Sequence, residues 1–289
     1  MPTIPVPPIR DERVRRIAVA AAKGGGGLLG VGTALAGAAI GVVVVQAALA
    51  KRAIGPRTTV PPYADGRYLP PGETTSRGTS LRLAVLGDSG AAGLGADDPD
   101  ATPGAVIARE LAAASGRPVL LTNTAVVGAQ SKDLAAQVDR ILAVRPNVAV
   151  IMVGANDVTH RVRPQLSVRL LGEAVERLRA EGCEVVVGTC PDLGTVKPLA
   201  VPLRQYARRT SRELAAAQRI AVLEHGGRPV MLGEELGELF DSDPETYFSA
   251  DRFHPSAAGY IACAHALLPE VLAALGMTSQ GELPALPAG

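Results

Sequence analysis

Five residues that lie far apart in the chain are of the types that acyl transfer requires: Ser89, Gly128, Asn156, Asp251 and His254. A serine hydroxyl becomes a nucleophile when a base takes its proton, and histidine suits this task because its pKa lies near working pH. A carboxylate three residues before that histidine can hold one ring nitrogen while the other faces the serine. Glycine and asparagine can supply N–H groups to a developing oxyanion. The set therefore predicts serine-based acyl chemistry.

The positions of these residues along the chain suggest how they meet. Residues 81–89 read LRLAVLGDS, an apolar run that stops at Gly-Asp-Ser, which predicts a buried strand ending in a tight turn. Such turns lie at the carboxyl edge of an α/β sheet, where ligands bind. Gly128 and Asn156 also follow apolar runs, although a turn glycine and a helix-capping asparagine are the alternatives for each alone. His254 precedes Pro255 at an expected helix start.

The other histidines are weaker candidates for the base. His225 follows the run IAVL, which we interpret as a strand, and so lies at a possible loop near the sheet edge. His160 follows the VGAND segment and could line a pocket, whereas His265 lies in an apolar stretch typical of a helix core. Two carboxylates upstream of the favoured histidine are fallback partners: Asp241 and Asp243.

Alternating strand and helix patterns predict an α/β domain. The expected strands read LRLAVL, PVLLTNTA, NVAVIMVG, EVVVGT and IAVL. The expected helices cover residues 103–114, 132–144, 167–180 and 206–218, with a last helix after Pro255. Short apolar strands alternating with amphipathic helices indicate βαβ units and a parallel sheet that is covered on both faces.

In the order and spacing of four short motifs, the chain resembles the SGNH (GDSL) hydrolase family. The resemblance rests on GDS at 87–89, Gly128, GxND at 154–157 and DxxH at 251–254, in that order. The stretches GTCPDL at 188–193 and HPSAAGY at 254–260 resemble actinobacterial members, and the similarity extends over roughly residues 81–272. The chain departs from the usual pattern at Ala91, where the family often has Ser or Thr, and at Ala125, where it often has glycine.

The resemblance implies a fold, a reaction and roles for the residues. The expected fold is flavodoxin-like, a three-layer α/β/α sandwich on a five-stranded parallel sheet of order 2-1-3-4-5. The implied triad is Ser89, His254 and Asp251. The implied oxyanion hole consists of the N–H groups of Ser89 and Gly128 and the side chain of Asn156. The expected reaction is ester hydrolysis with no metal or organic cofactor. Acyl transfer to another hydroxyl, and an inert membrane-tethered binding domain, are the rivals.

The chain divides by composition into five segments: a basic arm at 1–23, an uncharged apolar segment at 24–50, a proline-rich tether at 51–80, the hydrolase domain at 81–276 and a tail at 277–289. As a helix, the apolar segment would be about 40 Å long, enough to cross a hydrocarbon core of about 30 Å. The basic arm predicts a cytoplasmic N-terminus and an extracytoplasmic catalytic domain. Cleavage near Ala50 with secretion is the alternative, and a buried helix is a third.

Composition excludes several other functions. The formal net charge is +1, and no basic cluster is interleaved with aromatic residues, so nucleic-acid binding is not expected. A GxGxxG match at 25–30 follows no strand, which argues against a dinucleotide site. The three cysteines, Cys183, Cys190 and Cys263, have no metal-binding spacing, and the first two flank a strand too long for a disulfide, so buried free thiols are favoured.

The substrate is expected to be a small-molecule, lipid or cell-envelope ester. Two insertions, at 191–205 and 226–250, are expected to frame the mouth of the pocket. Five of their apolar residues are either an acyl channel or, the interpretation we favour, ordinary packing residues: Leu193, Val196, Leu236, Leu239 and Phe248.

Overall fold

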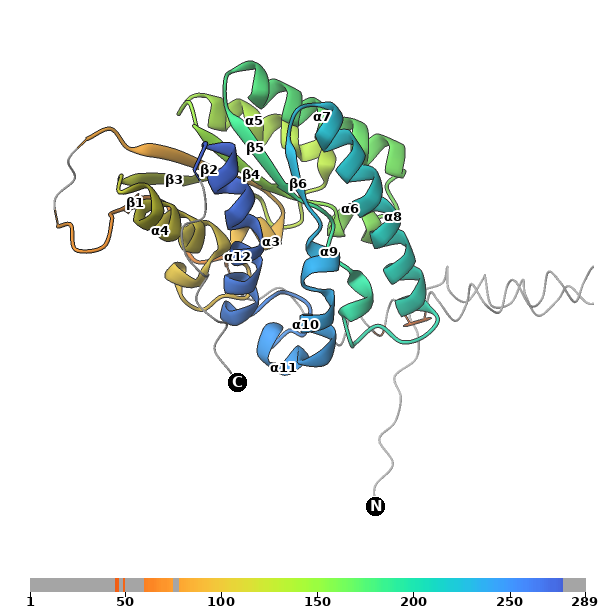
Figure 1. Ribbon diagram of the computed structural model, residues 1–289. Coiled ribbons are helices and arrows are strands. Elements are labelled where there is room, and N and C mark those ends of the chain that lie inside the picture. Colours follow the sequence, from red (N-terminus) through yellow and green to blue (C-terminus); the bar gives the residue numbers. More distant parts are fainter. Residues whose placement is uncertain (1–44, 47–48, 50–59, 75–77, 278–289) are drawn as a thin grey trace, which may run out of the picture. The chain divides into compact units, whose positions relative to one another are not determined.

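The computed structural model describes residues 45–46, 49, 60–74 and 78–277 (Figure 1). The basic arm, nearly all of the apolar segment 24–50 and all but the first residue of the tail therefore lie outside the described residues. Residues 60–74 and 78–277 belong to one compact unit of the chain.

The sheet has six strands in the order β1-β3-β2-β4-β5-β6. Their bounds are Gly66–Tyr68 for β1, Leu81–Gly87 for β2, Val119–Asn123 for β3, Val148–Met152 for β4, Glu184–Gly188 for β5 and Arg228–Val230 for β6. Strands β2 to β6 are mutually parallel and, numbered among themselves, run in the expected order 2-1-3-4-5. Four of the five predicted strand positions, all but the last, are confirmed.

The sixth strand corrects the prediction of a tether over 51–80. Strand β1 pairs antiparallel with β3, and Tyr68 lies opposite Val119. The carboxylate of Asp65 also accepts a hydrogen bond from the N–H of Asn123 at 2.9 Å. A strand of three residues is too short to show an alternating pattern. The prolines near it in the sequence therefore led to the prediction of a tether.

The last predicted strand, IAVL at 220–223, is wrong. These residues form the final turn of α8, Leu203–Glu224, and the true fifth parallel strand is β6. Ile220 and Leu223 face solvent while Val222 is buried, so the run is amphipathic at helical spacing. Strand β6 reads RPV and lies at the edge of the sheet, where proline is tolerated.

Helices cover both faces of the sheet (Figure 1). The larger ones are α4 (Pro103–Ser115), α5 (Leu134–Leu142), α7 (Pro164–Ala180), α8 and α12 (Ala257–Ala274), which confirms the helices predicted there. Alternate residues of each strand point to opposite faces. Leu83 and Val85 of β2 therefore pack with α4 and α12, whereas Ala84 and Leu86 pack with α5 and α7.

Within the described ranges, α12 is the one helix long and apolar enough to cross a membrane. Half of it is buried inside the domain, against β5 and α4. It therefore serves as a core helix. Short elements near the carboxyl edge of the sheet complete the domain: α3 (Ser89–Ala92), η1 (Pro99–Ala101), η2 (Ser131–Asp133), α6 (Ala155–Thr159), η3 (Leu193–Thr195), α9 (Leu232–Glu235), α10 (Gly237–Ser242) and α11 (Pro244–Tyr247).

Candidate active site

Ser89 is the first residue of α3 and follows β2 after a sharp turn. Gly87 makes this turn possible: its φ is +134°, and a Cβ there would lie 1.8 Å from the carbonyl oxygen of Met152. Asp88 then caps the short helix by accepting the N–H of Gly90 at 2.9 Å. The serine side chain is thereby placed at the carboxyl edge of the sheet, as the apolar run ending in GDS predicted.

The structure brings Ser89, His254 and Asp251 into one hydrogen-bonded chain. Ser89 Oγ lies 3.1 Å from His254 Nε2, and His254 Nδ1 lies 2.6 Å from Asp251 Oδ2. A carboxylate only accepts hydrogen bonds, so the Nδ1 atom of neutral His254 carries the proton and Nε2 is free to accept one. Ser89 and His254 are 7% and 5% exposed, so this chain is largely shielded from water.

The carboxylate of Asp251 is itself held in place. Its Oδ1 atom accepts hydrogen bonds from Ser249 Oγ and from the N–H groups of Phe253 and His254, at 2.8 to 2.9 Å. Burial alone would raise the pKa of Asp251, but the hydrogen bonds from the His254 ring and from these two N–H groups outweigh burial and lower it. The carboxylate therefore stays ionised where it can orient the imidazole.

The fallback carboxylates lie elsewhere. Asp241 forms an ion pair with Lys197 at 2.7 Å, and Asp243 accepts the N–H of Thr246 at the start of α11. The His254 ring bonds to Asp251 instead. Asp241 and Asp243 are therefore engaged in an ion pair and a helix cap, and neither is the partner of the His254 ring.

The remaining histidines are also accounted for. His225 caps the end of α8 and bonds to Ala221 O at 2.8 Å, so the expectation that it follows a strand near the carboxyl edge is wrong. His160 bonds to Asn156 O just after α6 and is exposed. His265 lies within the last helix, as predicted, but it is half-buried and not part of the core.

Asn156 lies in the first turn of α6, directly after β4, and is 8% exposed. Its side-chain N–H group lies 3.5 Å from Asp88 Oδ2, next to the serine turn. Gly128 lies in the loop after β3, at a φ of +86°. That loop is attached to the serine turn because the N–H of Val126 donates to Gly87 O at 3.1 Å. Both residues are thus on loops that border the nucleophile.

Burial gives Asp88 an unusual ionisation. Desolvation raises its pKa to about 6, against opposing contributions from the N–H of Gly90, from His254 and from the side chain of Asn156. Asp157, which lies nearby, adds a smaller upward contribution.

Two fully buried glutamines, which the sequence analysis missed, fix the strand ends. Gln137 on α5 forms both possible hydrogen bonds with Gly87, at 2.7 and 2.9 Å. Gln218 on α8 accepts the N–H of Cys190 and donates to Val153 O, which joins the ends of β5 and β4. The available signal was a polar residue on the inward stripe of an amphipathic helix, as Gln137 is between Leu134 and Ile141.

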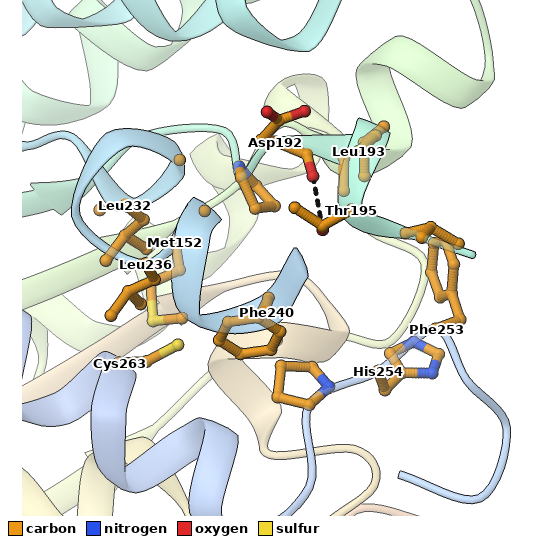
Figure 2. Close-up of a pocket in the computed structure, with 18 of the residues that line it drawn as sticks. Met152, Asp192, Leu193, Thr195, Leu232, Leu236, Phe240, Phe253, His254 and Cys263 are labelled. Carbon is orange, nitrogen blue, oxygen red and sulfur yellow. Dashed lines mark hydrogen bonds between the residues drawn. The ribbon is translucent and has the colours of Figure 1, made fainter. Parts of the chain in front are cut away.

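A pocket of about 120 Å³ opens beside Ser89 and His254. Most of the residues around it are apolar, and Figure 2 shows His254 at one end and Leu232 and Leu236 at the other. Four of the five proposed channel residues line it: Leu193, Val196, Leu236 and Phe248. Leu239 packs beside this group instead. These four residues pack in the hydrophobic interior and also line the pocket, so the acyl channel stays a prediction beside the favoured interpretation.

All three cysteines are free and buried, as predicted. Burial raises the pKa of Cys190 and raises the pKa values of Cys183 and Cys263 to about 12. None is therefore a ready thiolate nucleophile beside Ser89.

Comparisons with known proteins place the chain in a family. The model of the GDSL-like lipase/acylhydrolase family matches residues 85–262. The chain is also 42% identical to the GDSL-like esterase Rv1075c of Mycobacterium tuberculosis, covering 88% of this chain and 82% of that protein. The chain belongs to the GDSL-like family. Membership of this family, together with the similarity to an esterase, identifies the protein as an ester-cleaving hydrolase.

Solved structures share the fold. One is LAE5, an alpha/beta hydrolase enzyme from the metagenome of Lake Arreo, at a TM-score of 0.54 and 22% identity, covering 70% of this chain and 99% of that one. Another is the acetylxylan esterase Axe2 of Geobacillus stearothermophilus, at a TM-score of 0.52 and 21% identity, covering 70% of this chain and 99% of that one.

Proposed function

We propose that this GDSL hydrolase cleaves carboxylic esters through an acyl-enzyme on Ser89. The observation that carries the proposal is the continuous chain from Ser89 Oγ to His254 Nε2 and from His254 Nδ1 to Asp251 Oδ2, at 3.1 and 2.6 Å. The hydroxyl attacks the ester carbonyl while His254 takes its proton, and His254 then gives that proton to the departing alcohol. Water, activated by the same imidazole, afterwards attacks the acyl group and releases the acid.

The oxyanion of each tetrahedral intermediate needs N–H donors. The proposed donors are the N–H groups of Ser89 and Gly128 and the side chain of Asn156, whose loops border the serine turn. Loss of one such donor costs about 10²–10³ in kcat. We therefore expect Asn156→Ala to lower kcat by that factor while the fold is retained.

The pocket beside the triad supports a short acyl group. An engineered apolar cavity of about 150 Å³ holds benzene, so a volume of about 120 Å³ suits an acyl chain of about six carbons or fewer. Rates for p-nitrophenyl esters of increasing chain length test this part, and a preference for long chains would contradict it.

Anchoring and export remain proposals. Segment 24–50 is uncharged and follows a basic arm, which supports a single membrane-spanning helix with an extracytoplasmic catalytic domain. Release near Ala50 by cleavage is the alternative outcome. Fractionation of cells that express the full chain, with protease added from outside, distinguishes the two.

The test of the reaction is Ser89→Ala. Ester hydrolysis should vanish while the circular dichroism spectrum is unchanged, since the side chain of Ser89 lines the pocket and its Oγ contacts His254 there. Retained turnover would remove the proposal. Adding an alcohol acceptor to the wild-type reaction shows whether the acyl group goes to water or to another hydroxyl.

A further inference from the structure

A buried polar contact joins the two loops that border the nucleophile. Ser131 begins η2, three residues after Gly128, and Asp157 follows Asn156 in α6. Both oxygens of the Asp157 carboxylate accept the N–H of Ser131 at 3.2 Å, and Oδ2 also accepts the Ser131 hydroxyl at 3.0 Å. Ser131 and Asp157 are each 1% exposed.

The sheet topology explains why this contact matters. The loop with Gly128 follows β3 and the loop with Asn156 follows β4, and these strands lie on opposite sides of β2. No strand pairing joins β3 to β4 in the described sheet, so their ladders do not set the distance between the two loops. The Asp157–Ser131 contact crosses the end of β2 and links the loops directly.

The contact is built to be rigid. Ser131 Oγ also lies 2.9 Å from Ser167 Oγ on α7, so the carboxylate, Ser131 and the helix form one buried network. Burial raises the pKa of Asp157, and the hydrogen bonds from Ser131 oppose that rise. Carboxylates are costly to bury, and this one is compensated by the N–H and the hydroxyl of Ser131.

We propose that Asp157 is a positioning residue that, through Ser131, sets the distance between the oxyanion donors on Gly128 and Asn156. This inference rests on the proposed oxyanion hole. Such donors act only when they lie 2.7–3.1 Å from the oxyanion, and a misplacement of about 1 Å can cost about 10²-fold in rate. The contact should therefore affect the transition state more than substrate binding.

The test compares Asp157→Ala, Asp157→Asn, Asn156→Ala and the double alanine variant with p-nitrophenyl butyrate. Asp157→Ala should lower kcat by about 10- to 100-fold with KM within about twofold. Asp157→Asn should keep most of kcat because its oxygen still accepts the N–H of Ser131 and its amide can donate to the hydroxyl. In the Asn156→Ala background, Asp157→Ala should cost less than in the wild type, since one of the two donors that it positions is already absent.

Controls separate positioning from folding. Ile141→Val removes one buried methyl group of α5 away from the loops and should leave kcat unchanged. If Asp157→Ala does not fold, Ser131→Ala replaces it, with a smaller loss of kcat and the same non-additivity. A normal kcat in the folded variant, or losses that multiply in the double variant, would overturn this inference alone. A normal kcat in Asn156→Ala would overturn the oxyanion hole itself.

Discussion

The substitution Asp251→Asn should nearly abolish activity although it changes neither size nor shape. Oδ1 of Asp251 accepts three hydrogen bonds, from Ser249 Oγ and from the N–H groups of Phe253 and His254. In the asparagine variant only the amide oxygen can take that position, so the NH₂ group must face His254 Nδ1. The imidazole then has to accept at Nδ1 and carry its proton on Nε2, where it points at Ser89 Oγ. In this tautomer it cannot take the serine proton.

The expected size of the effect follows from that tautomer. Turning the amide over would restore the correct tautomer but would set NH₂ against the N–H groups of Phe253 and His254 and lose two hydrogen bonds of about 1 kcal/mol each. The wrong tautomer therefore prevails. In a serine protease triad the same substitution lowers kcat by about 10⁴, or about 5.5 kcal/mol of barrier. We expect a similar loss of kcat with p-nitrophenyl butyrate, measured at saturating substrate.

A matched control isolates the tautomer. Asp241→Asn makes the same chemical change at a carboxylate that pairs with Lys197, and kcat should stay within about twofold of wild type. If Asp251→Asn also retains kcat within about tenfold, Asp251 does not set the tautomer of His254, and the assignment of the triad carboxylate is incorrect.

Three further changes give independent tests. Gly87→Ala puts a methyl group 1.8 Å from Met152 O and should lower Tm by about 10 °C, whereas Gly72→Ala, at a φ of +83° in open space, should lower Tm far less by differential scanning fluorimetry. Folding raises the pKa of Asp88 from 3.8 to about 6, so the protonated form is favoured by the fold and its contribution to stability is lost as pH rises through 6. The stability of wild type relative to Asp88→Asn in urea should therefore fall by about 3 kcal/mol from about pH 3 to pH 7, and a flat difference would contradict the burial effect. Leu236→Ala enlarges the far end of the pocket and should raise the rate for octanoyl relative to butyryl p-nitrophenyl esters; an unchanged ratio would mean that the acyl chain lies elsewhere.

Local patterns predicted where the proposed reacting groups lie because the constraints on their placement are local. The turn at Ser89 needs a buried strand, a glycine and a small capping residue in succession, and those appear directly in the sequence. The spacing of Asp251 and His254 across one turn likewise limits how the two side chains can meet. The order of the parallel strands was predicted from the family resemblance, because the sequence of a single strand does not show which strands it pairs with.

Features that depend on long-range packing were not predictable in this way. The strand Gly66–Tyr68 forms because β3 offers a free edge for pairing. A sequence of three residues does not show that such an edge is available. Residues 220–223 are equally apolar in sequence, and only the position of α8 on the sheet decides which of them are buried. Gln137 is a polar residue on an apolar helix face, but nothing near it in the sequence identifies Gly87, fifty residues away, as its hydrogen-bond partner.

The most direct test of the central claim is to trap the acyl group. The full chain is mixed with p-nitrophenyl acetate, quenched in acid within the first turnover and digested, and the peptides are weighed by mass spectrometry. The proposed acyl-enzyme mechanism predicts one added acetyl group on the peptide that contains Ser89, and none at that position in Ser89→Ala or after prior reaction with a fluorophosphonate. Acetylation of another residue during active turnover, with Ser89 unmodified, would contradict it.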